Sequence, residues 1–203
     1  MAAELKKKRD VIVRWERKFA GSVSFAVIQS RPIGVWEFLI PIMFILTFMK
    51  GRQQRELFVQ NFMFTKNMAL QAAFDIVGQK HTRDQAISQI KARTDEVLAS
   101  PEVKGLYSEG IRSRQLIEID LLVDHYCKLL QTEGKDHNAL VIGAYQNKAA
   151  YTNFITQLKT AEKNVADAAR ETLGTKADEE ALAKLDSATD RIRAKAANMI
   201  FQD

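Results

Sequence analysis

The chain contains little that bends or crosslinks a backbone. Among its 203 residues there are three prolines, nine glycines and one cysteine, Cys127. A single cysteine excludes an intrachain disulfide and is typical of a protein in a reducing compartment. Strand-like alternation is scarce as well, and Ala, Leu, Lys, Gln and Glu dominate the second half of the chain. This composition predicts an all-α protein.

The sequence also lacks the signatures of common catalytic sites. It has no Gly-x-Ser-x-Gly motif, no glycine-rich phosphate loop and no Cys and His pair at a suggestive spacing. Glu118, Asp120, Asp124 and His125 cluster on one predicted helix, but a di-metal helical bundle needs Glu-x-x-His motifs on two helices, and the chain has none. We therefore expect no catalytic activity, no bound metal and no cofactor.

Positive charge is concentrated at the start of the chain. The first 32 residues hold eight Lys or Arg against three acids. Residues 2–29 predict a basic amphipathic helix, whose apolar stripe is Val11, Trp15, Phe19, Val23 and Val27. Such a helix either lies on a membrane surface or docks on helices further along the chain. Because no zinc-finger or RNA-binding motif accompanies the basic residues, we expect no nucleic-acid partner.

The most apolar run covers residues 33–49 and carries one charge, Glu37. As a helix it would be about 25 Å long, slightly less than the ~30 Å hydrocarbon core of a bilayer, and Pro41 lies at its middle. Three placements fit: a bent transmembrane span, a re-entrant segment that leaves the bilayer by the side it entered, or a buried core helix. Lys and Arg flank the run on both sides, whereas the translocated side of a single span is usually depleted of them, so the re-entrant placement is favoured.

We expect this segment to hold the protein to the cytoplasmic face of a membrane. The residues expected in hydrocarbon are Trp36, Phe38, Leu39, Ile40, Pro41, Ile42, Phe44, Leu46 and Phe48. Basic residues on either side are expected at the lipid headgroups, namely Arg31, Lys50, Arg52 and Arg55.

Two regions follow from this pattern. Residues 1–80 are the predicted membrane-associating region, which ends in a helix over 56–77 rich in Phe and Met. Residues 81–203 are the predicted helical-bundle domain, with helices over 82–99 and 108–132. In the second of these, the expected core residues are Ile119, Leu122, Tyr126 and Leu129.

The last third of the chain predicts a long antiparallel helical hairpin. Its first helix repeats apolar or small residues in steps of three and four, at Tyr151, Phe154, Leu158, Ala161, Val165, Ala168 and Thr172. Its second helix does the same at Leu182, Leu185, Thr189, Ile192, Ala196 and Met199. Matched stripes joined by a short break are typical of two helices that pack on each other.

The leading hypothesis is a membrane-anchored helical interaction or scaffold protein without catalytic activity. Its expected partners are the lipid bilayer and, through the C-terminal hairpin, another protein or a second copy of the chain. The alternative is a soluble helical bundle with residues 33–49 as a core helix, which binds an apolar ligand or a partner helix among the Phe and Met side chains of residues 58–74.

Overall fold

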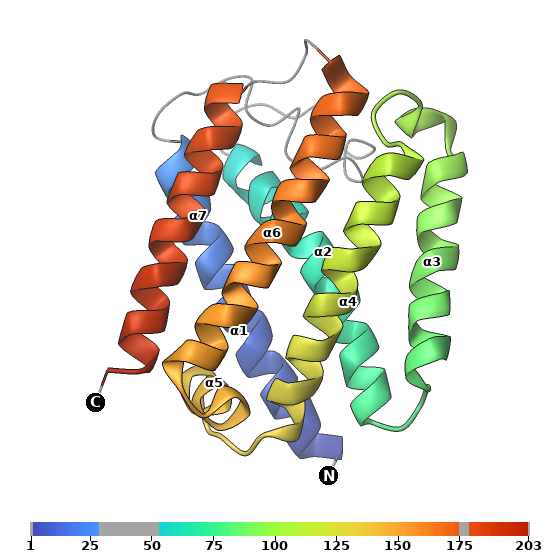
Figure 1. Ribbon diagram of the computed structural model, residues 1–203. Helices are drawn as coiled ribbons and strands as arrows, with labels where there is room; N and C mark the ends of the chain where they lie inside the picture. Colours follow the sequence, from blue (N-terminus) through green and yellow to red (C-terminus); the bar gives the residue numbers. More distant parts are fainter. Residues whose placement is uncertain (1, 29–52, 175–178, 203) are drawn as a thin grey trace.

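Figure 1 shows the computed structural model of the chain, in which residues 2–28, 53–174 and 179–202 are described. All regular structure in these ranges is helical, so the predicted all-α class is confirmed. The elements are α1 (Ala2–Ile28), α2 (Gln53–Val77), α3 (Arg83–Ala99), a 3-10 helix (Pro101–Val103), α4 (Glu109–Gln131), α5 (His137–Tyr145), α6 (Lys148–Leu173) and α7 (Glu179–Ile200).

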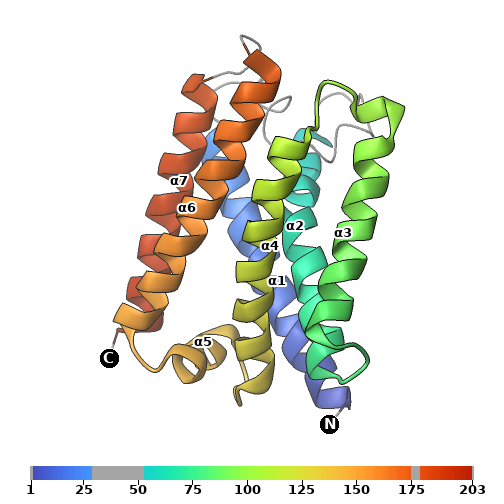
Figure 2. The same ribbon diagram turned by 45° about the vertical axis from the view of Figure 1, so that its right-hand side comes forward.

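The long helices form an up-and-down bundle. Helices α1, α2, α3, α4, α6 and α7 alternate in direction, and short α5 closes the lower end (Figures 1 and 2). Both ends of the chain lie at that lower end, whereas α1 ends and α2 begins at the upper end. The most extensive helix pairs are α2 with α4, α4 with α6, and α1 with α2.

Side-chain capping residues mark the starts of α3, α4, α5 and α6. Thr82 caps α3: its side chain accepts a hydrogen bond from the backbone N–H of Gln85, and the Gln85 side chain accepts one from the Thr82 N–H. Ser108 caps α4 by accepting from the N–H of Ile111. The predicted helix range 108–132 is therefore confirmed, because α4 with its N-cap and C-cap residues covers it.

The main core is centred on α4. Its four predicted core residues are all buried, and Tyr126 is among the largest fully buried side chains. They pack in one cluster with Ala69 and Ala73 of α2 and with Leu158 of α6. Small residues on α2 let the backbones approach closely, which explains why this helix pair is so extensive.

Helix α1 docks on the bundle, which is one of the two placements that its sequence left open. Ile12, Phe19, Val23 and Val27 are buried. Trp15 is half-buried and stacks on the His137 ring, with centroids 3.9 Å apart and planes 4° apart. The basic residues of α1 lie mostly on its outer side, exposed to solvent.

The predicted hairpin is formed by α6 and α7, which lie side by side and run in opposite directions (Figure 1). On α6 the predicted stripe is correct, with Tyr151, Leu158, Ala161 and Ala168 buried. On α7 it is displaced: Met199 is 60% exposed, and the buried residues are Ala188, Thr189, Arg193, Ala197 and Ile200. The displacement arises because α7 packs on α1 as well as on α6.

The apolar segment 33–49 and its neighbours Arg31, Lys50 and Arg52 lie outside the described residues. Within the described ranges, no helix combines the length and hydropathy needed to cross a membrane. Helices from both sides of the predicted boundary between residues 80 and 81 share one core. The membrane role assigned to residues 1–80 stays a prediction.

Truncating Leu122 to alanine tests the core. Leu122 is 1% exposed at the centre of the main cluster, so we expect Leu122→Ala to lower the free energy of unfolding by about 2–5 kcal/mol in urea titrations. The matched control on the same helix is Ile117→Ala. Ile117 is 59% exposed, and its loss is expected to change stability by less than about 0.5 kcal/mol. Equal losses in the two variants would contradict this core.

Candidate functional site

A buried ion pair joins α1 to α2. The Lys66 Nζ lies 2.9 Å from Glu16 Oε2, and the Tyr126 hydroxyl of α4 donates a 2.8 Å hydrogen bond to Glu16 Oε1. Both charged side chains are buried. Burial alone would raise the pKa of Glu16, but the Lys66 ammonium and the two hydrogen bonds hold that pKa below its usual value. Glu16 is therefore ionised at neutral pH.

A second ion pair joins α6 to α7. Both guanidinium NH groups of Arg193 donate to Glu162, each at 2.6 Å, in a bidentate arrangement. The Phe19 ring of α1 is shared by the two ion pairs, because its centroid lies 5.6 Å from Arg193 Cζ and 5.9 Å from Lys66 Nζ. The two pairs thus form one charged layer that crosses the bundle.

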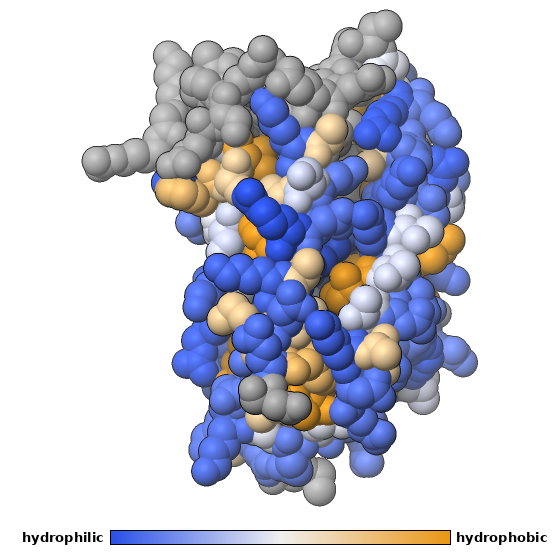
Figure 3. All heavy atoms as spheres, turned by 60° about the vertical axis from the view of Figure 1, so that its left-hand side comes forward, coloured by the Kyte–Doolittle hydropathy of each residue, from blue (hydrophilic) through white to orange (hydrophobic). Residues whose placement is uncertain are grey.

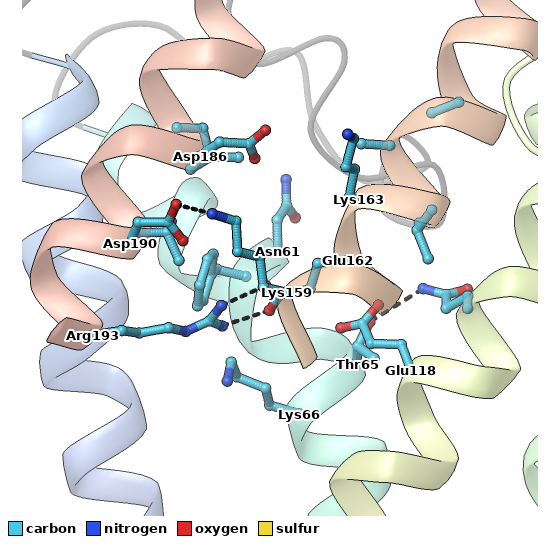
Figure 4. Close-up of a pocket in the computed structure, with 17 residues that line it drawn as sticks. Asn61, Thr65, Lys66, Glu118, Lys159, Glu162, Lys163, Asp186, Asp190 and Arg193 are labelled. Atoms are coloured by element: carbon cyan, nitrogen blue, oxygen red, sulfur yellow. Dashed lines mark hydrogen bonds and ion pairs between the residues drawn. The ribbon is translucent and has the colours of Figure 1, made fainter. Parts of the chain in front are cut away.

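A cleft of about 150 Å³ opens beside this layer, between α2, α4, α6 and α7 (Figure 4). Its apolar wall consists of Phe62, Val165, Ala166, Ala169 and Leu185. The polar lining residues come from all four helices, and they are Asn61, Thr65, Lys66, Gln115, Glu118, Lys159, Glu162, Lys163, Asp186, Thr189, Asp190 and Arg193. A concave site with an apolar wall and converging polar groups is the usual form of a small-molecule site.

Glu118 differs from the other acids of the cleft. Glu162 is paired with Arg193, and Asp190 is paired with Lys159. In the described part of the chain, no hydrogen bond or ion pair engages the half-buried Glu118 carboxyl. Burial, together with the nearby Glu162 carboxylate, raises the pKa of Glu118 to about 8, although Lys66 and Arg193 act in the opposite direction. Strongly shifted groups in clefts are candidates for functional residues.

The structure separates the acidic cluster that the sequence shows on α4. Glu118 faces the cleft, whereas Asp120 and Asp124 both bind Arg83 of α3 at the surface. His125 is buried, and its Nδ1 lies 2.7 Å from the Tyr145 hydroxyl of α5. Among the described residues, no group of three or more His, Cys, Asp or Glu is placed to hold a metal ion.

A basic groove lies between α1 and α7. It is lined by Lys18, Gly21, Ser22, Phe25, Ala26, Arg191, Ile192 and Lys195, with no acid among them. Phe25 is 51% exposed, and Arg55 of α2 stands over its ring with 5.3 Å between Cζ and the centroid. Figure 3 shows a face on this side of the molecule, which is mostly hydrophilic with scattered apolar residues.

Of the residues expected at a membrane, only Arg55 is described, and it is exposed beside this groove. The nine residues expected in hydrocarbon, and Arg31, Lys50 and Arg52, belong to the range that the structure leaves undescribed.

Sequence reasoning missed Glu16, Lys66 and Arg193. A signal for each was present, because each charged residue occupies a helical position three or four residues from buried apolar ones. Glu16 lies between Ile12 and Phe19, and Lys66 lies between Met63 and Ala69. A charge within an apolar stripe indicates a buried ion pair when a second helix offers the opposite charge.

Comparison of the chain with protein-family models, with curated proteins and with solved structures gives no match. Its function is therefore argued from its own residues.

Removing Lys66 should destabilise the fold, because it leaves the Glu16 carboxylate buried without its cation. We expect Lys66→Met to lower the free energy of unfolding by about 3–5 kcal/mol in urea titrations at pH 7. Lys163→Met is the matched control: this lysine is exposed on α6, and its loss should cost less than about 0.5 kcal/mol. The double variant Glu16→Gln/Lys66→Met should recover part of the loss. Equal stability of Lys66→Met and wild type would contradict a structural role for the pair.

The raised pKa of Glu118 predicts a pH-dependent stability. Between the ordinary pKa of 4.5 and about 8, the folded state holds a proton that the unfolded chain releases. The free energy of unfolding should therefore fall as pH rises through this window, by on the order of 2–4 kcal/mol after allowance for partial exposure. In Glu118→Gln this component of the pH dependence should vanish, which urea titrations at pH 5, 7 and 9 would measure. Parallel profiles for the two proteins would contradict the shift.

Proposed function

We propose that this protein is a membrane-attached helical interaction module without catalytic activity, held to the cytoplasmic face of a bilayer by the apolar segment 33–49. The observation that carries this proposal is the position of the two helices that flank the segment. Val27, near the end of α1, and Phe58, near the start of α2, are each 2% exposed and belong to one buried cluster. The end of α1 and the start of α2 therefore lie side by side.

This adjacency favours re-entry over a single span. A single crossing would put α1 and α2 on opposite sides of the membrane, whereas the two helices pack on each other in one bundle. Half of the connection 29–52 is about 12 residues, or about 18 Å as helix, which is less than the ~30 Å hydrocarbon core. A segment that enters and returns would thus reach into one leaflet.

The energetics support insertion. Apart from Pro41, eight large apolar side chains are expected in hydrocarbon, and they would gain on the order of 10–20 kcal/mol on transfer from water at about 25 cal/mol per Å². Glu37 would oppose this by about 3 kcal/mol on insertion scales, or less if it protonates or reaches the headgroups. The basic groove between α1 and α7 starts at Phe25 and Ala26, near the same end of the bundle. Lys18, Arg191 and Lys195 line the groove further along the helices and suit anionic headgroups.

The bundle itself supplies the surface for interaction. Its alanine-rich hairpin is supported from within by α1 and α4, so its outer face is free for a protein partner or a second copy of the chain. Met199 leaves an exposed apolar side chain on that face.

The soluble alternative is less well supported. The described helices already enclose a continuous core, from Ile12 of α1 to Ile200 of α7, without a further core helix. Most of the Phe and Met side chains expected to surround an apolar ligand pack against neighbouring helices, as the buried Phe58, Met63 and Met68 do, and Phe62 alone among them lines the cleft.

Vesicle binding and topology test the proposal together. The full chain should float with vesicles that contain anionic lipid and stay bound in high salt, whereas a variant with residues 33–49 replaced by an equally long Gly/Ser linker should not. Circular dichroism of the linker variant should retain the helical signal, because the bundle core lies elsewhere.

Sidedness is measured with single cysteines. With Cys127 replaced by Ser, Ala3→Cys and Gln202→Cys should both react with an impermeant reagent from the same side of sealed vesicles. Labelling from opposite sides would overturn re-entry, and recovery of the wild type in the supernatant would overturn membrane attachment and favour the soluble alternative.

A further inference from the structure

We propose that the cleft between α2, α4, α6 and α7 binds a small aliphatic amine, whose ammonium group is held by the Glu118 carboxyl and whose carbon chain lies on the apolar wall. This binding site is separate from membrane attachment and does not depend on it.

The charge pairing in the cleft selects a cationic ligand. Three of the four cations that line the cleft are engaged: Arg193 with Glu162, Lys159 with Asp190, and Lys66 with Glu16. The fourth, Lys163, is exposed on α6 and has no ion-pair partner among the described residues. The acids are not all engaged, because Glu118 and Asp186 also line the cleft and neither has an ion-pair partner among the described residues. An anion would meet one unpaired cation, Lys163, which lies apart from Glu118 in Figure 4, whereas a cation would meet two unpaired acids.

Figure 4 shows how these groups lie. The Glu118 side chain extends from α4 toward the interior of the cleft, on the side opposite Arg193, and Asp186 lies on α7 above the Asp190 and Lys159 pair. Gln115, one turn before Glu118, is fixed by accepting from the Tyr107 hydroxyl at 2.9 Å and by donating to Thr65 at 3.1 Å. The cleft floor is thus held in place while the carboxyl above it remains available.

The volume and the apolar wall of the cleft limit the size and the polarity of the carbon chain of the ligand. A cavity of about 150 Å³ is the size that holds one benzene molecule, which has six heavy atoms. Phe62, Val165 and Leu185 give a wall suited to methylene groups. An amine with about four carbons fits both limits, and a second ammonium at the far end would lie toward the mouth of the cleft.

Binding should be coupled to deprotonation of Glu118. The charged groups that face this carboxyl are Lys66 of α2, Glu162 of α6 and Arg193 of α7. With a pKa of about 8, about one-tenth of Glu118 is ionised at pH 7 and about nine-tenths at pH 9, while an alkylammonium group stays largely protonated throughout. The affinity for an amine should therefore rise about tenfold over this range.

Calorimetric titration of the full chain with 1,4-diaminobutane tests the site. We expect saturable binding with one site per chain, and an affinity that rises about tenfold from pH 7 to pH 9. Glu118→Gln should weaken binding at pH 9 by about tenfold or more and remove the pH dependence. Glu96→Gln is the matched control, because it removes the same charge from an exposed position on α3 and should bind like the wild type.

Each comparison has an outcome that overturns the proposal. Absence of saturable binding at pH 9, or equal losses in Glu118→Gln and Glu96→Gln, would show that the cleft holds no amine. Displacement of the diamine by an equal concentration of Mg²⁺ would show general charge screening instead of a site. Binding of 1-butanol as tight as that of the diamine would show that the carboxyl plays no part. Thermal unfolding of both variants checks that they remain folded.

Discussion

The pairing of buried charges constrains the rest of this bundle. Glu16 and Lys66 are each largely removed from water, and so is Arg193. An isolated charge at such a depth would cost several kcal/mol, so each helix is stable in its place only when the partner helix is also in place. The Glu16, Lys66 and Tyr126 contacts connect α1, α2 and α4, and the Arg193 pair connects α6 to α7. Apolar stripes alone would allow neighbouring helices to rotate or slide, whereas charged pairs allow one register.

This constraint explains both what the sequence predicts and where it fails. The α4 stripe was predicted correctly because its four apolar residues recur at steps of three and four, and the buried neighbours Val123 and Leu130 widen the same face. The α7 stripe was not, because Thr189 belongs to both candidate faces, and the buried one also contains Arg193. Hydropathy alone predicts that an arginine is exposed. Arg193 is nevertheless buried, because the Glu162 carboxylate of α6 accepts two hydrogen bonds from its guanidinium group. Helix α5 was not predicted, since nine residues give too few turns for a periodic pattern.

The candidate site was predictable only in part. Glu118 was visible as an acid on α4, but its separation from Asp120 and Asp124 depends on which neighbours α4 meets. Arg83 of α3 engages those two aspartates at the surface, and Glu118 is left facing α6. The charged groups that shift the pKa of Glu118 lie more than forty positions away along the chain: Glu162 raises this pKa and Lys66 lowers it. A pattern of neighbouring residues in the sequence cannot predict that residues so far apart along the chain come into contact.

The cleft and the end of the bundle that carries the apolar segment share their supports. Phe19 contacts the cations of both ion pairs, and it also packs in the cluster of Val27 and Phe58 that holds the end of α1 beside the start of α2. The Lys66 ammonium neutralises Glu16 and also lowers the pKa of Glu118. A charged ligand bound in the cleft would therefore interact with Lys66 and Phe19, the same side chains that keep α1 and α2 adjacent. Because the proposed re-entry of segment 33–49 would require this adjacency, the ion-pair layer is the part of the molecule through which a ligand in the cleft would influence membrane attachment.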